Sequence, residues 1–227
     1  MKAKNSRLSG VFYLCMIIFG VFAQVIRLNI LTFDEGVETM KIIADSIFIL
    51  RLSFVCDLMQ ALFYLLTAWA LFNILKHFNK NLSLLFLILT VVAVAVYSAN
   101  MLNHIAIIEL NSINYLHLET NELKSATRFY TNLHEYGYLI SQLFFGLWLF
   151  PLGIIVLQSK IMPKYFGVML IAATVGALAE FFIIFLFPGN EIVTCPGLVL
   201  GMTGEFSFCF WLLYKGLGKV KEYEKNT

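Results

Sequence analysis

The chain has 227 residues, of which 60% are hydrophobic and 13% are charged, and its formal net charge is +2. A soluble domain is nearer half apolar and a quarter charged, so this composition indicates an integral membrane protein. The small net charge gives no reason to expect a nucleic-acid partner, and no polar stretch is long enough for a separate soluble domain.

Six apolar segments are long enough to cross a bilayer, for which about 20 residues suffice. They cover residues 10–30, 48–75, 83–108, 133–157, 166–187 and 197–217. Because lipid offers no hydrogen bonds to an open backbone, a spanning segment must be a helix or part of a closed barrel. These lengths favour helices. The sequence therefore predicts an all-α fold, a six-transmembrane-helix bundle that forms one integral membrane domain over residues 1–227.

Basic residues gather at one set of segment ends. Eleven of the sixteen Lys and Arg residues lie near the two termini or in the loops after the second and fourth segments. Basic residues favour the cytoplasmic side, so the N-terminus and the C-terminus are both predicted to be cytoplasmic, in the cell inner membrane. The two longer external connections, 34–46 and 111–132, carry helical patterns and are expected to form short interfacial helices. Pro151 predicts a kink in the fourth span.

Strong polar side chains occupy the predicted external half of every span. Asp57 lies roughly 13 Å below the external end of its helix, at about 1.5 Å per residue. A carboxylate at such a depth costs about 2.5–3.5 kcal/mol on insertion scales. The cytoplasmic halves are almost wholly Leu, Ile, Val, Phe and Ala. This asymmetry predicts a polar pocket that opens to the outside above an apolar plug.

Helical spacing indicates that the polar residues converge. Asn100 and His104 share a helix face, as do His134 and Gln142. The candidates for ligand binding or proton carriage are Asp57, Gln60, Asn100, Glu180, Glu205, Arg27, Arg51 and Gln142. A structural interpretation stays open, in which Asp57 simply pairs with Arg27 or Arg51. In that interpretation the two glutamates are protonated hydrogen-bonding partners.

A divalent metal is the one cofactor for which the sequence offers ligands. His104, His134 and Asp57 could hold it, with a coordination position left for water and another carboxylate as base. Against this hypothesis, the sequence has no His-Glu-x-x-His motif. A buried histidine more often makes a hydrogen bond than binds a metal.

The stretch from His134 to Ile171 reads HEYGYLISQLFFGLWLFPLGIIVLQSKIMPKYFGVMLI. Its characteristic residues are His134, Gly137, Phe144, Phe145, Gly146, Gly153, Ser159, Pro163 and Gly167. In these residues the chain resembles the bacterial domain-of-unknown-function family 4386, whose members are small multi-pass membrane proteins. The likeness covers most of the chain, although Leu152-Gly153-Ile154 stands where the family usually has Leu-Gly-Tyr. The resemblance implies a bacterial multi-pass protein and implies no activity.

Three functions stay open. The outward-facing polar site favours the first function, which is binding or transport of a small cation or polar solute. The second is a metal-dependent intramembrane hydrolase that acts on a lipid or envelope substrate, so enzymatic activity is an open question. The third is a structural or accessory membrane subunit. The lipid bilayer is the one partner that the sequence requires, and it leaves the oligomeric state open.

Overall fold

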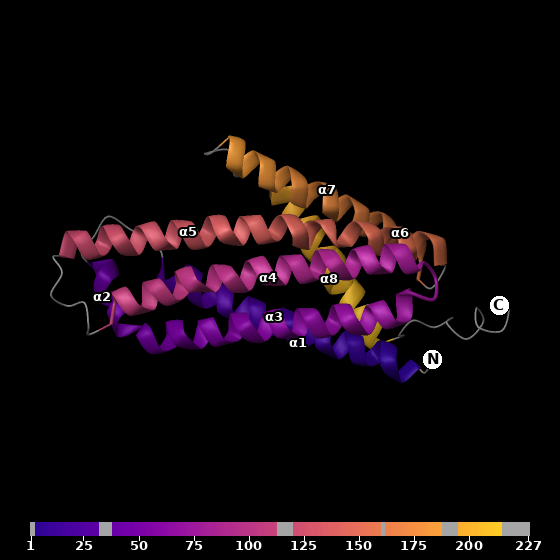
Figure 1. The fold of residues 1–227 in the computed structure, drawn as a ribbon, viewed down its shortest axis with the longest axis horizontal. Coiled ribbons are helices and arrows are strands. Elements are labelled where there is room, and N and C mark those ends of the chain that lie inside the picture. Colours follow the sequence, from indigo (N-terminus) through magenta and orange to yellow (C-terminus); the bar gives the residue numbers. More distant parts are fainter. Residues whose placement is uncertain (1–2, 32–37, 113–119, 160–161, 188–194, 215–227) are drawn as a thin grey trace. The chain divides into compact units, whose positions relative to one another are not determined.

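The computed structural model describes residues 3–31, 38–112, 120–159, 162–187 and 195–214. These residues form helices, and no strand is found among them (Figure 1). The helices are α1 (Ala3–Ile30), α2 (Glu38–Asp45), α3 (Ile47–Leu75), α4 (Lys80–Leu110), α5 (Thr120–Leu147), α6 (Leu149–Ser159), α7 (Lys164–Leu186) and α8 (Cys195–Tyr214). The predicted all-α fold is confirmed for the described part of the chain.

Five helical stretches of the described residues are long and apolar enough to span a membrane. They are Arg7–Ile30, Ile47–Leu75, Lys80–Leu110, Asn121–Ser159 and Lys164–Leu186. Large apolar side chains are exposed along all five, as lipid contact requires, among them Val21, Leu58, Val91, Ile140 and Val175. The chain is therefore a multi-pass membrane protein. α8 corresponds to the sixth predicted span, whose last residues lie outside the described chain. The count of six and the cytoplasmic termini stay predictions.

The fourth span differs from its prediction at both ends. α5 starts at Thr120, well before the predicted residue 133, because neither Pro nor Gly interrupts the chain between them. The prediction of a separate interfacial helix within residues 111–132 is therefore wrong. The described residues from Thr120 onward form the first turns of α5 instead. The helix is broken at Trp148, three residues before Pro151. Proline lacks an N–H and its ring clashes with the carbonyl four residues earlier, which explains the break.

The chain divides into two compact units, and several helices contribute segments to both. The Asp57 unit comprises Cys15–Leu62 and Ala95–Leu139. The Glu205 unit comprises Met1–Leu14, Phe63–Val94 and Ile140–Thr227. In the Glu205 unit α7 packs against α6 and α8. Gly153 and Gly167 allow the close approach of α6 and α7, because a Cβ on either would lie 2.8–2.9 Å from the carbonyl oxygen of the other.

Candidate functional site

Asp57 of α3 lies at the centre of a polar cluster inside the Asp57 unit and is 0% exposed. The guanidinium of Arg27, from α1, pairs with the Asp57 Oδ2. Arg27 is itself buried, and its Nη2 donates to Gln24 Oε1 at 2.7 Å. A buried carboxylate is stable only when it is paired and hydrogen-bonded in this way. Of the two arginines that the sequence offered as partners, the structure selects Arg27, whereas Arg51 lies on the exposed surface.

Tyr97 of α4 engages the other oxygen of the carboxylate. Its hydroxyl donates to Asp57 Oδ1 at 2.5 Å and lies 3.2 Å from Gln60 Oε1. A hydroxyl has one hydrogen to donate, and the short bond to the charged oxygen takes it. The sequence analysis missed Tyr97, because an aromatic residue in an apolar helix is typical of packing. Its spacing was the available signal, since it shares a helix face with Asn100 and His104.

His104 of α4 faces the same carboxylate. Its Nδ1 lies 3.6 Å from Asp57 Oδ2, and its Nε2 lies 3.4 Å from Ser53 Oγ. The Ser53 hydroxyl donates its single hydrogen to the carbonyl oxygen of Leu50 at 2.9 Å, so toward His104 it acts as an acceptor. With Ser53 bonded to Leu50 in this way, a neutral His104 donates from Nε2 to Ser53. Nδ1 then presents a lone pair to the carboxylate.

This arrangement leaves two acceptors facing each other. The Nδ1 of His104 is buried and has no hydrogen-bond partner among the described residues. A lone pair against a negatively charged oxygen is unfavourable in an interior of low dielectric constant. One added proton on Nδ1 would convert the contact into an imidazolium–carboxylate pair. A proton on His104 Nδ1 would therefore complete the hydrogen bonding between His104 and Asp57.

His134 of α5 lies beside His104, with 5.6 Å between the ring centroids. Asn100 Nδ2 donates to the His134 carbonyl oxygen at 2.8 Å and lies 3.4 Å from its Nδ1. Asn103 donates to Asn100 Oδ1 at 2.9 Å, which fixes the orientation of that amide. An amide nitrogen only donates, so in this contact His134 Nδ1 is the acceptor. Gly137 makes room for this contact, because a Cβ there would clash with the Asn100 amide.

An apolar cluster lies beyond the polar cluster, toward the predicted external ends of the helices. Its residues are Ile30, Ile43, Leu50 and Ile108, with Ile26, Leu31, Ile47, Phe54 and Leu123 packed against them. On α1, α3 and α4 the buried residues Ile30, Leu50 and Ile108 lie about one turn outward of Arg27, Ser53 and His104. His104, like Asp57, is 0% exposed. The polar cluster is therefore closed in this conformation, and the outward opening stays a prediction.

Three predicted site residues, Gln142, Glu180 and Glu205, belong to the Glu205 unit instead. Glu205 on α8 interacts with the Tyr13 hydroxyl and the Trp148 indole N–H. Both groups are buried, and neither makes a hydrogen bond of ordinary geometry with a described residue. The structure thus gathers six of the predicted residues in the polar cluster of the Asp57 unit: Arg27, Asp57, Gln60, Asn100, His104 and His134.

Of the three residues proposed as metal ligands, Asp57 and His134 are already engaged by protein groups. Arg27 and Tyr97 occupy the two oxygens of Asp57, and the guanidinium places a positive charge where a cation would bind. Asn100 faces His134 Nδ1. In the part of the chain that the structure describes, no three His, Cys, Asp or Glu side chains are grouped to hold a metal ion.

The helices and the buried ionic cluster define a multi-pass α-helical membrane protein with a polar site inside its apolar segments. The family model described as Domain of unknown function (DUF4386) matches residues 8–216, so the chain belongs to this family. An "Uncharacterized protein" of Archaeoglobus fulgidus is 30% identical over 149 residues, which cover 66% of this chain and 74% of that protein. No solved structure matches the chain. The family resemblance inferred from residues 134–171 is confirmed, and the relative is archaeal.

Proposed function

We propose that this protein is a proton-linked binding or transport protein of the membrane, with His104 and Asp57 as its proton site. The observation that supports this best is the unbonded His104 Nδ1, 3.6 Å from Asp57 Oδ2. A proton needs no cavity and no hydration shell, so it fits between side chains that are already packed. The sequence predicts binding of a small cation or polar solute, and we propose that the cation is a proton bound at this position.

Proton binding would change the charge of the closed site. While His104 is neutral, the charges of Arg27 and Asp57 cancel. A protonated His104 would share the Asp57 carboxylate with Arg27, so that two positive charges would face one negative charge in a buried environment. This excess charge would favour a conformation in which water reaches the cluster over the closed conformation.

The Asp57 Oδ2 provides a route from the proton to a second ligand. Arg27 and His104 both approach this oxygen, so a protonated His104 competes with Arg27 for it. A guanidinium released from its carboxylate binds planar anionic or polar groups through paired hydrogen bonds. Opening of the apolar cluster would expose this group to a solute. Proton binding and solute binding would then be coupled through one oxygen atom.

Proton flux into proteoliposomes tests the proposal. A vesicle-trapped pH-sensitive dye reports flux driven by a membrane potential, with and without a small-molecule extract of the expressing cells. His104→Gln retains a hydrogen-bonding side chain that holds no added proton. His134→Gln is the matched control, because a glutamine oxygen can still accept from Asn100.

We expect flux in the wild type and in His134→Gln, and at least a tenfold loss in His104→Gln. Absence of flux from the folded wild type under both conditions would contradict a transport role. Equal flux in all three proteins would show that His104 does not carry the proton. Either result would leave the structural interpretation, in which the Arg27–Asp57 pair locks the helices together.

A further inference from the structure

A second polar site surrounds Glu205 of α8, inside the Glu205 unit. The hydroxyl of Tyr13, from α1, and the indole N–H of Trp148, at the break between α5 and α6, both face its carboxyl. Each of these two side chains is 0% exposed, and neither polar group makes a hydrogen bond of ordinary geometry with a described residue. Two buried donors therefore converge on one carboxyl that the proposed function does not use.

The close packing of α1 against α8 fixes this arrangement. A Cβ on Gly10 would lie 2.9 Å from the backbone nitrogen of Leu213, so a larger residue would force the two helices apart. Tyr13 lies about one turn further along α1, where its ring contacts Phe208 with 6.0 Å between the centroids. The crossing at Gly10 thus brings the Tyr13 hydroxyl to the part of α8 that carries Glu205.

Aromatic rings surround the polar groups of this site. Trp148 stacks on Phe86 with 4.9 Å between the ring centroids, and its edge contacts to Tyr64 and Tyr13 have centroid distances of 5.0 and 6.2 Å. In such an environment an ionised carboxylate is unfavourable unless it is paired or hydrogen-bonded. Because the rings are in contact with one another, a proton is the ligand that fits without a cavity.

The titratable groups that face Glu205 carry no positive charge. They are Tyr13 of α1 and Cys209 of α8 itself, and Tyr64 of α3 faces Tyr13 in turn. α7 also packs against α8, but neither its Lys164 nor its Glu180 interacts with Glu205. Tyrosine and cysteine side chains are neutral or negative, so none of these groups can balance a carboxylate.

The basic residue that α1 brings to α8 lies too far away to serve as a counter-ion. Arg7 Nη2 is 3.5 Å from the carbonyl oxygen of Tyr214. This position is roughly 13 Å further along α8 than Glu205, at about 1.5 Å per residue. In the part of the chain that the structure describes, no ion pair therefore holds Glu205 in its ionised form.

The same neighbours can bond to both protonation states of the carboxyl. A carboxylate accepts from the Tyr13 hydroxyl and from the Trp148 indole, and hydrogen bonds to a charged oxygen are shorter and stronger than neutral ones. A protonated carboxyl accepts from Trp148 through its carbonyl oxygen and donates its own hydrogen to the Tyr13 oxygen. Both states thus have partners, as a group that exchanges a proton requires.

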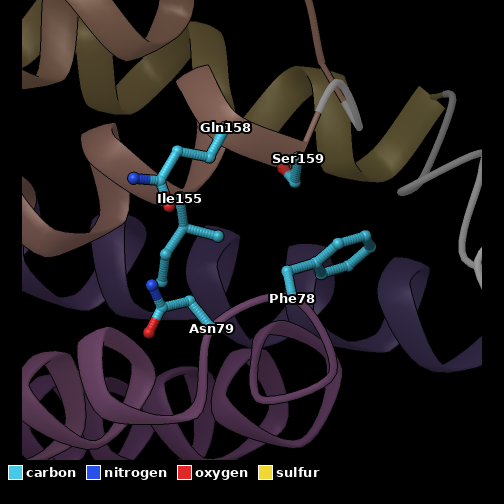
Figure 2. Close-up of a pocket in the computed structure, with 5 residues that line it drawn as sticks. All are labelled: Phe78, Asn79, Ile155, Gln158 and Ser159. Atoms are coloured by element: carbon cyan, nitrogen blue, oxygen red, sulfur yellow. The ribbon is translucent and has the colours of Figure 1, made fainter.

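Trp148 connects this site to a short helix that has room to shift. α6 begins at the next residue, and Pro151 in its first turn interrupts the regular helical bonding. The other end of α6 borders a cavity of about 140 Å³, which is lined by Phe78, Asn79, Ile155, Gln158 and Ser159 (Figure 2). Protein interiors are otherwise close-packed, so free volume beside a helix makes its displacement easier.

We propose that Glu205 binds and releases a proton, and that release draws the Tyr13 hydroxyl and the Trp148 indole onto the carboxylate. On release the carboxyl O–H bond breaks, the electron pair stays on the oxygen and the proton passes to water. The contacts in this structure correspond to the protonated form. This inference does not rest on the proton site at His104, since a carboxyl and an imidazole report their protons through different signals.

Infrared difference spectroscopy between acidic and alkaline buffers measures this proton directly. A protonated carboxyl has a C=O stretching band that a carboxylate lacks. Glu205→Gln removes the titrating group and keeps an acceptor for the Trp148 indole. Glu180→Gln is the matched control, because it makes the same change on α7 of the same unit. Circular dichroism and the thermal midpoint verify that each variant is folded.

The Trp148 indole supplies a second readout that needs no substitution at Glu205. Two-dimensional ¹H–¹⁵N NMR resolves the indole N–H signals of the three tryptophans, Trp69, Trp148 and Trp211. The variants Trp69→Phe and Trp211→Phe assign these signals by elimination. Trp69 is the internal control, since it is 58% exposed and lies outside the aromatic contacts of Trp148.

We expect a protonated-carboxyl band that disappears as the pH rises in the wild type and in Glu180→Gln, and that is absent from Glu205→Gln. The Trp148 signal should shift over the same pH range as this band, whereas the Trp69 signal should not. A band unchanged in folded Glu205→Gln would overturn the proposal. So would a Trp148 signal that stays fixed over the whole pH range in which the wild type is folded, whether or not Glu205→Gln folds.

Discussion

Replacing Asp57 with Asn removes the charge that Arg27 faces, while the Tyr97 hydroxyl keeps an amide oxygen as its acceptor. The guanidinium, in a residue that is only 7% exposed, then remains buried without a counter-ion. Breaking a buried ion pair from one side costs about 3–5 kcal/mol. We expect the free energy of unfolding of Asp57→Asn to fall by this amount, and that of Arg27→Gln to fall comparably. Reversible unfolding in mixed micelles with increasing sodium dodecyl sulfate measures both values.

The double variant Arg27→Gln/Asp57→Asn distinguishes a coupled pair from two independent sites. It leaves two neutral amides that can hydrogen-bond to each other, so its loss should be smaller than the sum of the single losses by at least about 2 kcal/mol. Arg51→Gln is the matched control, because an exposed substitution usually stays within about 0.5 kcal/mol. Additive losses in the double variant, or an equal loss in Arg51→Gln and Arg27→Gln, would refute the assignment of the pair.

Two further predictions use the same unfolding assay. Tyr97→Phe removes the donor to Asp57 Oδ1 and should cost about 1.5–3 kcal/mol, as for hydrogen bonds to charged groups; an unchanged stability would contradict that bond. Gly137→Ala should cost about 1–3 kcal/mol, because its new methyl group clashes with the Asn100 amide. Gly204→Ala should be neutral or stabilising by up to about 1 kcal/mol, since a Cβ there meets no described atom within 4 Å. Equal effects of the two glycine substitutions would contradict this packing.

Hydrophobic patterning was sufficient to find the polar cluster. Charged residues stand out in apolar segments because burying them is unfavourable without partners, so Asp57 and Arg27 could be named from the sequence. Glu205 stands out for the same reason, yet it belongs to the other unit. Segment patterns give the depth of a residue in the membrane, but not which helices pack against each other. For that reason the sequence predicts that polar residues of all six segments converge, whereas the polar cluster in the structure contains residues of α1, α3, α4 and α5.

The closed state of the site could not be predicted from the sequence. Leu50 is 0% exposed and belongs to the apolar cluster, whereas Leu52 is 40% exposed, although both are leucines of one apolar helix. Lipid-facing and buried positions therefore look alike in composition. The tautomer of His104 also requires geometry, since it depends on the bond that Ser53 makes to a backbone carbonyl. The sequence can name a histidine but not the nitrogen that carries its proton.

The proton on His104 can be observed directly by ¹⁵N NMR of protein labelled at its four histidines. Spectra of His104→Gln and His134→Gln assign the two buried rings. The structure predicts that neutral His104 carries its proton on Nε2 and leaves the lone pair of Nδ1 toward Asp57. A neutral ring protonated on Nδ1 would contradict a proton site at Asp57.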